Sequence, residues 1–215
     1  GKKIMKNRNF LRRPFTYSYN RYTLILILLN VLIFYARRFF QNIDIYFPLN
    51  SIAIARYKMY WQFVTYMFMH GNLSHLFFNM LGLLIFGTQV EKTIGSKEFL
   101  MFYFVTGALS GVLSYFYYYF TGQNATLVGA SGLVYAVLYA YAVLYPRSTF
   151  FFWGIIPIPA PVLVVIYTVI ELGSQIFTVS NVAHYTHLFG FFTAWLYFVV
   201  RMGIHPIKVW KNAYK

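Results

Sequence analysis

Six long apolar stretches divide this chain of 215 residues, and they favour a bundle of membrane-spanning helices. A span needs roughly 20 mostly apolar residues to cross a bilayer. The stretches cover residues 22–39, 69–90, 99–120, 129–145, 161–177 and 183–202. Charged residues make up only 10% of the chain, whereas soluble proteins carry about 25%. We therefore predict an all-α, polytopic membrane protein with six transmembrane helices.

The charged residues are mostly basic and lie mainly outside the apolar stretches. Eighteen Lys and Arg against four Asp and Glu give a net charge of +14. Such an excess can indicate nucleic-acid binding, but these residues gather near the ends of the chain rather than on a solvated face. We expect the lipid bilayer, and no nucleic acid, as the partner. Cysteine is absent from the sequence, which excludes disulfides and thiolate metal sites.

The positions of Lys and Arg predict the orientation, because cytoplasmic loops are enriched in them. Residues 1–21 and 203–215 form basic tails, and six spans put both tails on the same, cytoplasmic side of a core over residues 22–202. Loops 122–126 and 174–181 carry no Lys or Arg and fall outside. The first external connection is an exception, because it carries four basic residues. The other fourteen lie on the cytoplasmic side.

With this topology, spans two, four and six all enter the membrane from the external side. Ser131 then lies at the start of span four and His187 near the start of span six. A serine becomes nucleophilic when a base takes its proton, and neutral histidine is the usual base. We predict a Ser131–His187 dyad that opens to the external or periplasmic side. The alternative is a Ser helix cap with glycines for tight packing.

Further polar side chains are predicted at the same depth. His75 and Asn79 are four residues apart, so they share a helix face and can both donate hydrogen bonds to an oxyanion, together with the Ser131 amide. Hydrogen bonding between helices is the alternative role. Tyr135 lies one turn after Ser131 and is placed to stack on His187, unless it is only a packing aromatic.

Histidines raise the question of a metal site, since His70, His75, His184 and His187 fall near the same side. The usual carboxylate or cysteine ligands are not seen nearby and no H-E-x-x-H motif occurs, so we predict no metal and no cofactor. His70 and His184 are expected to tie loops down by hydrogen bonds. Glu171, near the outer end of span five, is an alternative third member of a triad, but it precedes His187 by sixteen residues and a dyad is the simpler prediction.

The ordered motifs resemble those of rhomboid intramembrane serine proteases. They are residues 70–75, residues 76–79, residues 129–132 with Tyr135, and residues 187–190. The resemblance covers roughly residues 22–202 and implies a six-transmembrane-helix rhomboid bundle. It implies Ser131 as nucleophile, His187 as base, and an oxyanion hole of His75, Asn79 and the Ser131 amide. Tyr135, Gly129, Gly190 and His70 fill supporting positions.

The same resemblance implies the substrate and the compartment. Single-span membrane proteins would be cut near the external face through an acyl-enzyme, in the cell (inner) membrane of a prokaryote. The family's Trp-Arg is Trp61-Gln62 here, and a glycine of the last span is Ala194. Because the chain starts with Gly1 and not Met, we expect flanking segments to have been trimmed. The oligomeric state is not predicted.

Two other functions stay open at this point. A catalytically silent relative would bind and escort membrane clients, although Ser131 and His187 are both present. A channel or small-solute transporter would be expected to show an inverted repeat and broken helices, and no clear repeat is seen.

Overall fold

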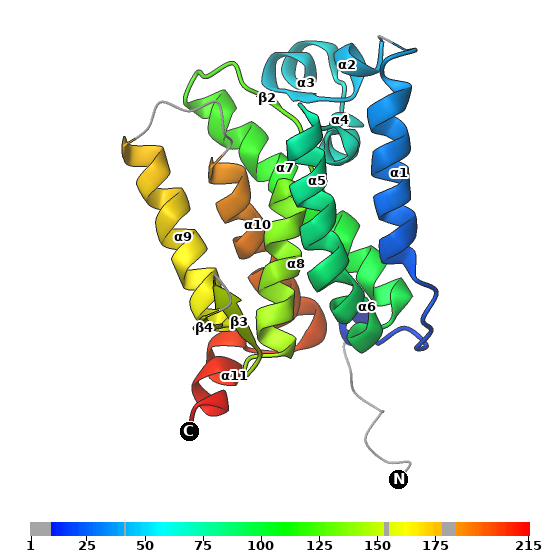
Figure 1. Cartoon of the computed structure of the whole chain (residues 1–215). Helices are drawn as coiled ribbons and strands as arrows, with labels where there is room; N and C mark the ends of the chain where they lie inside the picture. The colour runs from blue at the N-terminus through cyan, green and yellow to red at the C-terminus, as the bar shows by residue number, and fades with distance from the viewer. Residues whose placement is uncertain (1–9, 41, 153–154, 178–183) are drawn as a thin grey trace.

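The structure is a computed structural model that describes residues 10–40, 42–152, 155–177 and 184–215, and it is a helical bundle (Figure 1). The helices of the bundle are α1 (Tyr22–Ala36), α5 (Leu73–Gly82), α6 (Thr88–Ile94), α7 (Ser96–Phe120), α8 (Ser131–Leu144), α9 (Ala160–Phe177) and α10 (His184–Tyr197). Two π-helical turns, η3 (Leu83–Gly87) and η4 (Phe198–Met202), join α5 to α6 and extend α10. Residues 1–9 of the predicted tail and residues 178–181 of a predicted loop lie outside the described residues.

The described residues contain fewer clear membrane spans than the six that the sequence predicts. Leu73–Ile94 and Ser96–Phe120 are long and apolar enough to cross a membrane. A third crossing exists if His184–Met202 and Pro206–Ala213, bent by 93°, form one span. Tyr22–Ala36, Ser131–Leu144 and Ala160–Ser174 are apolar but shorter. The described residues therefore show two or three clear spans in a mostly helical chain, and six stays a prediction.

Helix α5 begins four residues later than the predicted stretch at residue 69. Asn72 has an extended backbone, and its side-chain oxygen accepts the backbone N–H of His75 at 2.8 Å. An Asn in this position satisfies one of the free N–H groups of the first turn and so fixes where the helix starts. His70 consequently lies in the segment before the helix, not on it.

Helices α8 and α10 pack together more closely than ordinary side chains would allow. A Cβ atom added at Gly190 would lie 2.1 Å from the carbonyl oxygen of Gly132. Ala136 and Ala140 of α8 and Ala194 of α10 are fully buried. Small residues at a helix contact let the two helix backbones approach closely. This contact sets the distance between the starts of the two helices.

A cap of short elements covers one end of the bundle (Figure 1). Its members are α2 (Ile43–Tyr46), β1 (Leu49–Asn50), α3 (Ser51–Tyr57), α4 (Gln62–Thr65) and η2 (Tyr66–Phe68). Strand β1 pairs with β2 (Thr126–Leu127), with Leu49 opposite Leu127. The Gly129 amide also donates to the Tyr66 carbonyl at 3.0 Å. The cap therefore holds the segment that leads into α8.

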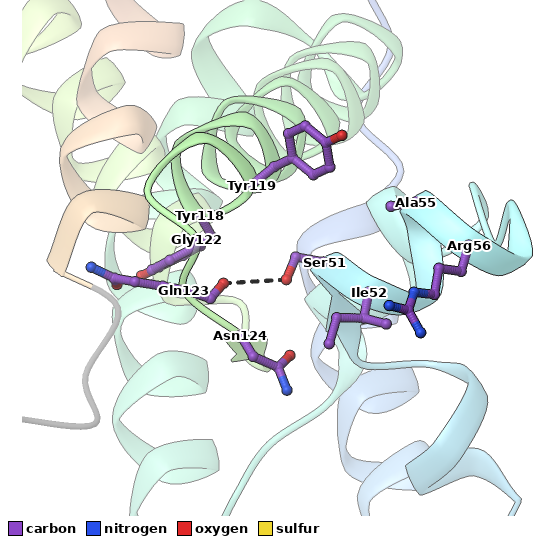
Figure 2. Close-up of a pocket in the computed structure, with 9 residues that line it drawn as sticks. All are labelled: Ser51, Ile52, Ala55, Arg56, Tyr118, Tyr119, Gly122, Gln123 and Asn124. Carbon is purple, nitrogen blue, oxygen red and sulfur yellow. Dashed lines mark hydrogen bonds between the residues drawn. The ribbon is translucent and has the colours of Figure 1, made fainter.

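The cap contains a hollow of about 200 Å³ between α3 and the end of α7, shown in Figure 2. Ser51 lies on one side of it and Gln123 on the other, and the Ser51 hydroxyl donates to the Gln123 carbonyl at 3.4 Å. The residues that line it include no histidine and no carboxylate. This hollow is therefore separate from the predicted serine and histidine.

The opposite end of the bundle carries the hairpin of β3 (Thr149–Phe152) and β4 (Ile156–Pro159), helix α11 (Pro206–Ala213) and the short helix η1 (Phe10–Arg12). The Arg12 guanidinium donates to the Val200 carbonyl at 3.1 Å. Glu98, buried in α7, accepts from Tyr197 and Arg201. The described start of the chain therefore lies beside the end of the last long helix.

Candidate active site

Ser131 and His187 meet where α8 and α10 begin. The Oγ atom of Ser131 is 2.8 Å from the Nε2 atom of His187. Ser131 is partly exposed, whereas His187 is only 8% exposed. A hydroxyl within hydrogen-bond distance of a buried imidazole is the arrangement that a serine nucleophile and its base require.

Gly129 shapes the turn into α8. Its φ of +120° is a conformation that side chains rarely adopt, and a Cβ atom here would come within 2.7 Å of the His75 ring. Glycine is the residue that accepts both constraints. The His75 ring thus rests against the main chain two residues before Ser131.

Asn79 lies beside the same turn. The residue is 6% exposed, and its Nδ2 has no hydrogen-bond partner among the described residues. A Cβ atom on Gly129 would lie 3.6 Å from this nitrogen. Buried donors are normally paired. The unpaired amide next to the start of α8 is therefore suited to donate to an acceptor such as an oxyanion.

Glu171 lies on the other side of His187. Its Oε1 is 3.0 Å from His187 Nδ1, and its Oε2 is 2.5 Å from His184 Nδ1. The residue is 5% exposed and belongs to α9. The structure therefore brings a carboxylate to the histidine that the sequence reasoning had left without one.

Tyr135 contacts both His187 and Glu171. Its ring lies parallel to the imidazole, with centroids 4.5 Å apart and planes 13° apart. Its hydroxyl also donates to Glu171 Oε1. The stacking matches the predicted supporting position, whereas the hydrogen bond to Glu171 was not foreseen.

His70 is buried behind His75, with ring centroids 5.2 Å apart in an edge-on arrangement. Its carbonyl oxygen accepts from Arg37, and Arg37 Nε lies 2.7 Å from Asp44 Oδ1. His70 thus ties its segment to the end of α1 through the main chain. His184 was expected to secure a loop, but it binds helix α9 through Glu171.

The family model of the rhomboid domain matches residues 57–203, more than half of the chain, and this region contains every residue of the candidate site. The chain belongs to the rhomboid family. It is accordingly an integral membrane protein.

Several curated rhomboids resemble this chain. The rhomboid protease GlpG of Haemophilus influenzae is 33% identical over 132 residues, which cover 61% of this chain and 64% of that protein. The chloroplastic rhomboid-like protein 11 of Arabidopsis thaliana is 36% identical over 57% of this chain and 41% of that protein. The rhomboid protease AarA of Providencia stuartii is 29% identical over 57% of this chain and 50% of that protein. The chain thus spans less than two thirds of these relatives.

Glu171, His184 and His187 could also hold a metal ion in this rhomboid, since each offers one ligand atom and the three atoms lie within 4.8 Å of one another. The prediction of no metal rested partly on the lack of a carboxylate near the histidines. That premise is wrong, because α9 brings Glu171 into contact with His184 and His187. Both histidines already hydrogen-bond to Glu171, each through its Nδ1 atom, which gives the cluster a role without a metal.

One sequence signal could have identified Glu171 as part of the site. It is the only charged residue between positions 161 and 177. An ionisable residue inside an apolar span is costly and is a functional candidate by default. Applied to Glu171, that reasoning would have placed it next to one of the polar residues of the site.

Proposed function

We propose that this rhomboid is an intramembrane serine endopeptidase in which Ser131 attacks the peptide carbonyl and His187 acts as its base. The observation that carries the proposal is the 2.8 Å contact between Ser131 Oγ and His187 Nε2. The relatives named as rhomboid proteases support the reaction class.

The acylation step follows from this contact. As Ser131 Oγ bonds to the substrate carbonyl carbon, its proton moves to His187 Nε2 and the carbonyl oxygen becomes an oxyanion. His187 then gives that proton to the departing amine as the C–N bond breaks. The carboxyl part of the substrate is left as an ester on Ser131.

Deacylation repeats the sequence with water. His187 takes a proton from the water molecule as it attacks the ester, and it returns the proton to Ser131 Oγ as the C–O bond breaks. In both steps Asn79 Nδ2, His75 and the Ser131 amide are the donors proposed for the oxyanion. Donors fixed before the reaction stabilise the developing charge without reorganising.

We also propose the predicted six spans, which are α1, α5 with α6, α7, α8, α9 and α10 with η4. Helix α8 has 14 residues, which corresponds to about 21 Å at 1.5 Å per residue, against roughly 30 Å of hydrocarbon. If the far end of α8 reaches one interface, Ser131 lies below the other. A short fourth span therefore supports cleavage within the membrane.

The substrates proposed are single-span membrane proteins cut near the external face. A regular helix hides its carbonyl groups in hydrogen bonds, so the substrate must unwind locally to reach Ser131. The proposed location is the inner membrane of a prokaryote, with both tails cytoplasmic. The proximity of Arg12 to Val200 supports tails on one side.

The direct test is cleavage of labelled transmembrane peptides by purified protein in detergent, with Ser131→Ala as the paired variant. The proposal expects cleavage by the native chain, none by Ser131→Ala, and labelling of Ser131 alone by a fluorophosphonate. An intact fold with neither cleavage nor labelling would instead favour the client-binding relative.

Orientation is tested by labelling introduced cysteines in cells whose outer surface is accessible, because the native chain has none. Gln123 and Lys97 are both exposed. Gln123→Cys should react with an impermeant maleimide from outside, and Lys97→Cys only after lysis. Reaction of both from one side would contradict the six-span arrangement.

A further inference from the structure

Glu171 is a buried carboxylate whose partners all belong to the proposed catalytic neighbourhood. It accepts from His187 Nδ1 at 3.0 Å, from His184 Nδ1 at 2.5 Å and from the Tyr135 hydroxyl. An isolated charge in such a dry place is strongly unfavourable unless donors surround it. Three donors from α8 and α10 supply that compensation, so α9 is fixed to the two helices that carry Ser131 and His187.

The contact with Glu171 determines which nitrogen of His187 carries the proton. An ionised carboxylate can only accept hydrogen bonds, so Nδ1 of His187 must be the donor. In a neutral imidazole the other nitrogen, Nε2, then has a free lone pair. That lone pair faces the Ser131 hydroxyl at 2.8 Å, as a base requires.

We propose that Glu171 is a positioning residue that extends the Ser131–His187 pair to a Ser–His–Glu triad. This inference rests on the proposed protease function. Glu171 holds His187 in the tautomer and ring orientation that can accept the Ser131 proton. When that proton reaches Nε2, the ring becomes positive with a carboxylate 3.0 Å away. The proton stays on His187, and Glu171 remains ionised.

His184 and Tyr135 hold the carboxylate itself. His184 hydrogen-bonds to Oε2 of Glu171, and Oε1 is directed at His187. Tyr135 shares Oε1 and at the same time stacks on the His187 ring. The imidazole is thus fixed along its edge by Glu171 and across its face by Tyr135.

The decisive variant is Glu171→Gln, which keeps the shape and removes the charge. An amide can hydrogen-bond either tautomer of His187, so the reactive one is no longer enforced. In a trypsin triad the equivalent change lowers kcat by about 10⁴. Here we expect a fall in kcat of roughly 10² to 10⁴ with little change in KM, because Glu171 acts through His187 and not on the substrate. Glu171→Asp, which keeps the charge, should recover part of the loss.

Glu98→Gln is the matched control, because Glu98 is also a buried carboxylate bound by a tyrosine but lies at the other end of α10. Its kcat should stay near that of the native chain. A kcat for Glu171→Gln equal to that of Glu98→Gln would overturn the inference. If native protein cleaves and Ser131→Ala does not, such a result would leave the proposed protease function standing.

A measurement on the native chain avoids dependence on the folding of any variant. Nitrogen-15 NMR of labelled histidines in detergent micelles distinguishes the two tautomers of His187, whose signals are assigned with His187→Asn. We expect a protonated Nδ1 and an unprotonated Nε2. A neutral ring protonated at Nε2 would overturn the inference whatever the variants do.

Chelation distinguishes the positioning role from a metal bound at the cluster. If Glu171→Gln lost activity because it lost a metal, a chelator would inactivate the native protein and a divalent ion would restore it. That outcome would overturn the positioning role. Unchanged kcat after chelation supports it.

Discussion

Two buried carboxylates fix helix α10 at its two ends, and they differ in what they hold. Glu98 accepts from the Tyr197 hydroxyl at 2.5 Å and from Arg201 at 2.8 and 2.9 Å. Glu171 accepts from the Tyr135 hydroxyl and from two histidines. Each therefore combines a tyrosine with nitrogen donors around a buried carboxylate.

The two sites differ in whether their nitrogen donors can lose a proton. Arginine keeps its charge at every physiological pH, so the pair of Glu98 and Arg201 is a permanent link. Histidine gains and loses a proton near neutral pH, and His187 also reaches Ser131. The same arrangement is thus purely structural at one end, and at the other it is suited to acid–base chemistry.

The largest loss of catalysis is expected when the nucleophile or the base is replaced. Ser131→Ala and His187→Ala should each abolish measurable cleavage, with losses of roughly 10⁴-fold or more in kcat/KM, and the double variant should be barely worse than either. The two residues act in one step, so their losses do not add. Kinetics of the three variants check this, and clearly multiplicative losses would contradict a shared step.

Asn79→Ala should have an intermediate effect, on kcat more than on KM. Removing one oxyanion donor costs about 10² to 10³ in kcat elsewhere, and we expect less here because His75 and the Ser131 amide remain. Steady-state kinetics separate the two constants. A change confined to KM would make Asn79 a substrate-positioning or structural residue.

Glu98→Gln should reverse the pattern, with a large effect on stability and a small one on catalysis. It leaves the Arg201 charge without its partner in a site where the side chain is only 12% exposed. Breaking a buried ion pair in this way costs about 3 kcal/mol of unfolding free energy. Denaturant unfolding in detergent measures the loss, and unchanged stability would show that the link at this end is dispensable.

Chelation should have the smallest effect. Because His184 and His187 are both already hydrogen-bonded to Glu171, EDTA is expected to leave the cleavage rate unchanged. Rates before and after dialysis against EDTA, with added zinc as the control, check this. An activity that is lost on chelation and restored by a divalent ion would favour the three residues as metal ligands.

Much of the fold could be predicted because apolar runs are local. Each of the six stretches contains helix in the described residues, and Gly190 of α10 lies against Gly132 of α8. The cap was not predicted, since segments of four to seven residues such as α3 and α4 show no clear periodicity. The start of α5 was missed because the Asn72 cap was not considered.

The family, the apolar character of the chain, and the candidates Ser131, His187, His75, Asn79 and Tyr135 can be predicted from the sequence, because order and spacing along the chain carry that information. The position of Glu171 depends on how the helices pack. Sixteen residues and a helix connection separate it from His187, and the rotation of α9 about its axis, which packing sets, decides whether the carboxylate faces lipid or the imidazole.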